Sequence, residues 1–143
     1  MKETIQNGVL IVNEKPPVWD RICEAFGMTP KNVIFAYGDR IYNPGGGVLP
    51  DFLIEHEKVH FKQQAGEVAV WWDKYLSDPQ FRLEQEIEAY AHQYNEMCKL
   101  TKDRNEHAKM LWGLSISLSS SIYNNIISHN EAMEVIQKLA KNI

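Results

Sequence analysis

Cysteines, long apolar runs and clusters of basic residues are all scarce in this chain of 143 residues. Its two cysteines, Cys23 and Cys98, form no CxxC pair, which favours reduced thiols over a disulfide framework. Its longest apolar runs, such as VIFAY, are far too short to span a membrane, and the N-terminus lacks the apolar core of a signal peptide. We therefore expect a cytoplasmic protein with no membrane partner.

The charge balance is mildly acidic. The formal net charge is −4, and no block of Lys or Arg stands out. A nucleic-acid partner is therefore not expected, because such partners require a basic surface. With 44% apolar residues, the chain is long enough to bury a core, and we expect one domain over residues 1–143. The sequence leaves the oligomeric state open.

The first third of the sequence contains the strand signals. Thr4 to Val12 is broken at Asn7-Gly8, a dipeptide typical of a tight hairpin turn. Val33 to Tyr37 is the strongest strand signal, because its residues are β-branched and aromatic. Gly38-Asp39 follows as a turn, so Arg40 to Tyr42 is expected to return antiparallel.

Helical signals dominate after residue 50. Gly27 ends an early helix, Ser77 is expected to cap the long helix that follows it, and Ser128 to Glu131 reads as a capping box. The expected helices cover residues 18–26, 50–65, 71–76, 78–101, 105–119 and 128–140. This order predicts an α+β fold class, with a small N-terminal antiparallel sheet followed by a mainly helical core.

The most informative stretch is HEKVH at residues 56–60. On a helix, His56 and His60 are four residues apart and share one face, so both imidazoles can reach a single cation. Glu57 can lean over an open coordination position of that cation. Two imidazole ligands and a neighbouring carboxylate base for a water molecule are the requirements of a hydrolytic zinc site.

A catalytic zinc needs a third protein ligand. Glu67 lies two turns beyond His60, which is too far along the helix axis. The other candidates are Glu84, Glu86 and Glu88 in the long helix of residues 78–101. On a helical wheel, Glu86 falls on the shoulder of the apolar stripe, whereas Glu84 and Glu88 fall on the polar face. The wheel therefore favours Glu86, with Glu88 and then Glu84 as alternatives.

HEKVH followed by Glu86-Ile87-Glu88-Ala89-Tyr90 resembles the gluzincin clan of zinc metallopeptidases, and the compact chain resembles the minimal zincins of bacteria and phages. The resemblance implies one zinc per chain held by His56, His60 and Glu86. It also implies that Glu57 is the catalytic base and that the substrate is a peptide or protein. Ala89 matches the small residue of the clan's pattern. Tyr90 occupies the position of an Asp that orients a zinc-bound His, so another group must do this if Tyr90 does not.

The resemblance also suggests how substrate is held. Gluzincins bind an extended peptide along an edge strand just before the motif helix. Arg40 to Tyr42 occupies that place here and is expected to be an exposed edge. The alternative is that Arg40 to Tyr42 is a covered edge and that the cleft admits only small amides. Trp71-Trp72 is expected either to pack in the core or to line an apolar pocket.

Three other interpretations stay open at this point. The histidines and glutamates of the motif can form pairs on a polar helix face with no metal. Glu84, Glu88 and His92, spaced by four, can join the motif in a carboxylate-bridged di-iron site. The chain can also be a zincin-like metal-binding or interaction protein without turnover.

Overall fold

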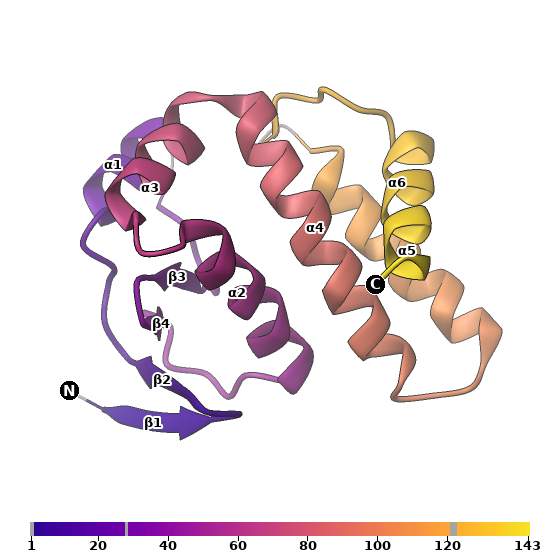
Figure 1. Cartoon of the computed structure of the whole chain (residues 1–143), viewed down its shortest axis with the longest axis horizontal. Coiled ribbons are helices and arrows are strands. Elements are labelled where there is room, and N and C mark those ends of the chain that lie inside the picture. Colours follow the sequence, from indigo (N-terminus) through magenta and orange to yellow (C-terminus); the bar gives the residue numbers. More distant parts are fainter. Residues whose placement is uncertain (1, 28, 121–122) are drawn as a thin grey trace. The chain divides into compact units, whose positions relative to one another are not determined.

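A computed structural model describes residues 2–27, 29–120 and 123–143. Within these residues the chain forms a small sheet and six helices, which confirms the α+β fold class (Figure 1). The α-carbon contacts divide the chain into two compact units, residues 1–77 and 78–143. The single domain over residues 1–143 stays a prediction. Among the described helices, none combines the length and apolar character that crossing a membrane requires.

The first unit contains the sheet. Its strands are β1 (Glu3–Gln6), β2 (Val9–Val12), β3 (Phe35–Tyr37) and β4 (Arg40–Tyr42), in the spatial order β1-β2-β4-β3. The β1–β2 hairpin turns at Asn7 and Gly8, both with positive φ, as the Asn-Gly signal predicts. The β3–β4 pair is also antiparallel, as predicted.

Two predictions about the sheet are wrong. The sheet is mixed, because β2 and β4 pair in parallel, and β4 is therefore an inner strand instead of an exposed edge. The chain leaves β2 through α1 (Trp19–Phe26), and the β3–β4 turn at Gly38 then brings β4 back between β3 and β2. The inner position buries Ile41 completely, and burying an Ile contributes roughly 1.5–3 kcal/mol.

The motif helix is α2 (Asp51–Gln64), close to its predicted bounds. Its residue Ile54 packs with Val9, Ile11 and Ile41 in the core of the first unit. Glutamine side chains tie both of its ends to the sheet. Gln6 of β1 donates to the Leu49 carbonyl and to Asp51, both at 2.9 Å, and Gln64 donates to the Ala36 carbonyl of β3 at 2.8 Å. The helix is thereby held in one position over the sheet.

Two further helices belong to this unit. In α1, Gly27 ends the helix in the left-handed conformation, as predicted. The helix α3 (Val68–Ser77) is longer than the predicted 71–76 and buries Trp71, Trp72 and Tyr75. The rings of Trp71 and Tyr75 stack with centroids 4.8 Å apart. The Trp pair therefore packs in the core, the first of its two expected roles.

The second unit consists of α4 (Pro79–Cys98), α5 (Arg104–Leu118) and α6 (His129–Lys141), which pack on one another (Figure 1). Their shared core contains Leu83, Leu111, Leu114, Leu118, Tyr123, Ala132 and Ile136. Asp78 caps α4 through its side chain, with Pro79 in the first turn, so the prediction of Ser77 as the cap is wrong by one residue. The capping box of Ser128 and Glu131 is confirmed.

Candidate metal centre

The two motif histidines lie one helical turn apart on α2. Their ring centroids are 5.0 Å apart, and the side chains of His56 and His60 are 12% and 5% exposed. An imidazole binds a metal ion through a ring nitrogen that carries no proton. The pair therefore has the placement and surroundings of a two-nitrogen ligand set.

His60 is oriented by neighbours on two sides. Its Nδ1 lies 2.8 Å from Oε1 of Gln63, and the ring centroid of Trp71 lies 5.2 Å from its own. Because an amide oxygen only accepts hydrogen bonds, this contact places the ring proton on Nδ1 and leaves the lone pair on Nε2. Gln63 thus fixes both the tautomer and the direction of the ring.

Glu57 lies beside both histidines. Its Oε2 is 3.8 Å from Nε2 of His56 and 3.9 Å from Nε2 of His60, and its side chain is only 5% exposed. These distances exceed those of a hydrogen bond, and they place the carboxylate nearly equidistant from the two ligand nitrogens. Burying a carboxylate costs free energy unless the group is paired or holds a metal.

The helix α4 has two buried stripes. One is apolar and packs on the core of the second unit through the buried Leu83 and the partly buried Ile87, Tyr90, Tyr94 and Met97. The other lies beside it and consists of four buried residues, Arg82, Glu86, Ala89 and Gln93. Glu84 and Glu88 are exposed, and Glu86 alone among the three candidate carboxylates is buried, as the wheel predicts.

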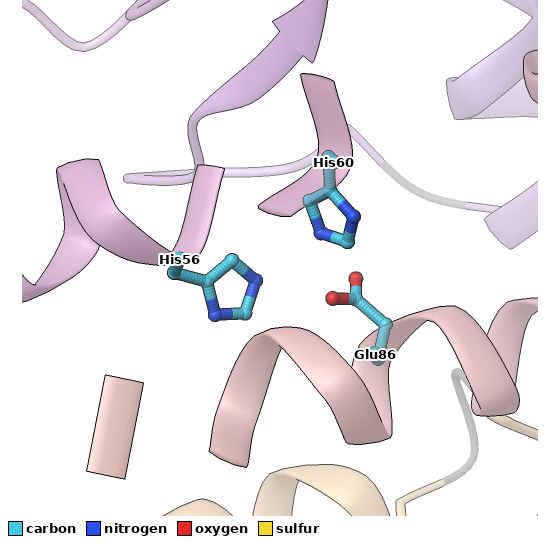
Figure 2. A group of neighbouring side chains, drawn as sticks. All are labelled: His56, His60 and Glu86. Carbon is cyan, nitrogen blue, oxygen red and sulfur yellow. The ribbon is translucent and has the colours of Figure 1, made fainter. Parts of the chain in front are cut away.

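His56, His60 and Glu86 form a group that could hold a metal ion. Each offers one ligand atom, and these atoms all lie within 4.8 Å of one another. Figure 2 shows the three side chains, two rings from α2 and the carboxylate from α4. Two nitrogens and one oxygen are donors that zinc accepts.

The structure does not support the di-iron interpretation. Glu84 and Glu88 point to solvent, and in residues 2–27, 29–120 and 123–143 no second group of three ligand-type side chains is close enough to share a metal. The interpretation of the motif as an exposed polar face is also wrong, because Glu57 and His60 are buried.

Sequence reasoning missed Gln63. Tyr90, at the position where gluzincins have an orienting Asp, packs against the core of the second unit. For His60 the orienting contact comes from Gln63, three residues later on the same helix. The spacing of three residues puts the two side chains on neighbouring positions of one face, and this is the signal that could have identified it.

No family model matches the sequence, and no curated protein or solved structure is significantly similar to it. The resemblance to gluzincins therefore stays a prediction that rests on the motif residues. The roles of His56, Glu57, His60 and Glu86 likewise stay predictions, now with a described geometry behind them.

Proposed function

We propose that this chain is a zinc-dependent hydrolase of the metallopeptidase type, which cleaves amide bonds. The observation that carries the proposal is the position of Glu57, a buried carboxylate 3.8–3.9 Å from Nε2 of both motif histidines. A carboxylate at that distance lies close enough to a metal held by the two histidines to act as the base for a metal-bound water. A hydrolase needs a base there.

The donor set favours zinc. His56, His60 and Glu86 supply two imidazole nitrogens and a carboxylate oxygen, the set of several zinc peptidases, and leave a fourth coordination position open. Zinc bound here would supply a Lewis acid and a water molecule whose pKa is lowered to about 7. We propose one zinc per chain.

The residues of the chain do the proton transfers and the positioning. Glu57 takes the proton from the attacking water and later gives it to the leaving amine, because its carboxylate lies 3.8 Å and 3.9 Å from the two ligand nitrogens. Gln63 keeps His60 in the tautomer that exposes Nε2. Trp71 packs against the His60 ring and limits its rotation. The hydrogen bonds of Gln6 and Gln64 hold both ends of α2, and with them the motif residues, in a fixed position on the sheet.

The first experiment separates catalysis from metal storage. Protein purified without a histidine tag is expected to contain about one zinc by elemental analysis and to hydrolyse amide substrates. Glu57→Gln is expected to lower turnover by about 10²–10⁴ while zinc content is unchanged. Glu67→Gln, an exposed glutamate just beyond the same helix, is the matched control and should be neutral. Wild-type protein that binds zinc but hydrolyses no amide would instead identify a metal-binding protein.

The second experiment tests the third ligand. Glu86→Ala is expected to weaken zinc binding at least about 100-fold, because losing a ligand costs more than losing a group that merely orients one. Glu84→Ala and Glu88→Ala, exposed neighbours on the same helix, should change zinc affinity less than about threefold. A zinc titration in which Glu88→Ala is the damaging change would refute the assignment.

A further inference from the structure

The outer edge of β3 is already occupied by side chains. β3 is a terminal strand of the sheet and pairs with β4 on one side only, with Ala36 opposite Ile41. On its other side, the Ala36 carbonyl accepts hydrogen bonds from Nε2 of Gln64 at 2.8 Å and from Nε1 of Trp72 at 3.1 Å. The Gly38 N–H donates to Oε1 of Gln64 at 3.0 Å.

The carboxamide of Gln64 therefore imitates a peptide group. It donates to the carbonyl of one strand residue and accepts from the N–H of the residue two positions later. This is the pattern by which a parallel neighbouring strand pairs with the two residues that flank its partner. The side chain of Gln64 takes the place that a further strand would need.

An incoming strand could not share these groups. A carbonyl oxygen has two lone pairs, and both are used at Ala36; an amide N–H donates once, and that bond is made at Gly38. Gln64 is 2% exposed and Trp72 is 4% exposed, so neither can swing into water without opening the core. Strand addition at β3 would leave buried polar groups without partners.

We infer that Gln64 determines the substrate class of the site: it excludes extended peptides paired along β3, and the site takes short amides recognised near the cleaved bond. The inference rests on the proposed function, because it concerns the same site. Gln64 follows His60 by one turn on α2, so the side chain that closes the β3 edge belongs to the helix that carries the motif. Of the two motif histidines, His56 is the more exposed, with 12% of its side chain exposed against 5% for His60.

A length series of substrates tests the inference directly. Acylated dipeptides, tetrapeptides and octapeptides with one common scissile bond are compared by kcat/KM. With β3 closed, kcat/KM should change less than about threefold across the series. Strand pairing would add roughly fivefold for each backbone hydrogen bond gained. A steep rise with length in the wild-type protein overturns the inference.

Hydrogen exchange supplies a readout that needs no turnover. In the wild-type protein the Gly38 amide should be protected, and in Gln64→Met, which keeps the side-chain length but removes the amide, it should exchange at least about tenfold faster. Gln137→Met, an exposed glutamine on α6, is the matched control. If Gln64→Met does not fold, Trp72→Phe removes one donor to Ala36 and leaves the Gln64 pairing in place, so Gly38 should stay protected. Fast exchange of Gly38 in wild type, or in Trp72→Phe, overturns the inference.

The binding of an extended octapeptide to Glu57→Gln separates this inference from the proposed function. The amide resonances of Ala36 and Gly38 should not move on titration. If they shift in a saturable way, peptide pairs at β3 and the inference fails. If no amide substrate of any length is hydrolysed by wild type while Gly38 is protected and these resonances stay fixed, the hydrolase proposal fails and the closed edge stands.

Discussion

The helices α2 and α6 are of similar length and are built in opposite ways. α6 begins with a capping box and buries only apolar residues, Ala132, Ile136 and Ala140. α2 begins at Pro50 with no side-chain cap, and three of its five buried residues, Glu57, His60 and Gln64, are polar or charged. In α6 the local signals agree with its apolar packing on α4 and α5, whereas α2 relies on its packing against the sheet and on the hydrogen bonds from Gln6 and Gln64.

The difference between α2 and α6 suggests that one helix mainly serves folding and the other mainly serves the site. Helices are stable when propensity, capping and apolar pattern agree, and violations of that agreement concentrate at functional sites. α2 violates it at the positions where the motif lies. The stability of the protein should therefore be sensitive to changes in α6, and its metal binding to changes in α2.

The largest expected effect comes from replacing one histidine by alanine in each of the two helices. His60→Ala in α2 should weaken zinc binding more than about 100-fold, because a ligand is lost. His129→Ala at the start of α6 should leave zinc affinity unchanged, since that ring packs on Trp112 with centroids 4.1 Å apart. Competition titrations with a zinc chelator measure both. Equal affinities in the two variants would remove the distinction between the helices.

A smaller effect is expected from the group that orients His60. Gln63→Met should weaken zinc binding about 10–100-fold, because the Nδ1 proton loses its acceptor. Gln63→Glu should bind zinc more tightly than wild type, since a carboxylate accepts more strongly and raises the basicity of the ring. Gln137→Met on α6 is the control. If Gln63→Met and Gln63→Glu shift the affinity in the same direction, Gln63 acts only through packing.

The smallest effects concern the capping box of α6. Ser128→Ala should lower the free energy of unfolding by about 1 kcal/mol without changing zinc affinity. The N–H and hydroxyl of Ser128 hold the pKa of Glu131 below its ordinary value of 4.5. The stabilisation is therefore complete above that value and is lost as pH falls through the lowered pKa. Denaturant unfolding at several pH values should show wild type losing its advantage over Glu131→Gln in acid; a constant difference would contradict this.

Much of the fold could be predicted because its signals are local. The Asn7-Gly8 turn, the end of α1 at Gly27 and the capping box at Ser128 each depend on a few adjacent residues. The burial of Glu86 follows from the period of one helix. The same reasoning correctly places His56 and His60 on one face of α2.

The rest depends on partners that are distant in the sequence. The parallel pairing of β2 and β4 joins residues about thirty positions apart, and no turn between them specifies it. Gln64 could not be recognised as an edge residue without knowing where Ala36 and Gly38 lie. A glutamine has the same appearance in sequence whether it points to solvent or completes a sheet.

The occupied edge of β3 has a consequence for how copies of the chain can associate. Sheets grow into filaments only when each copy offers two open edges, one to receive a strand and one to extend the array. Of the four described strands, β3 is closed by Gln64 and Trp72, and β1 is left as the open edge. Pairing through β1 alone would join two copies and leave no further edge open among the described strands.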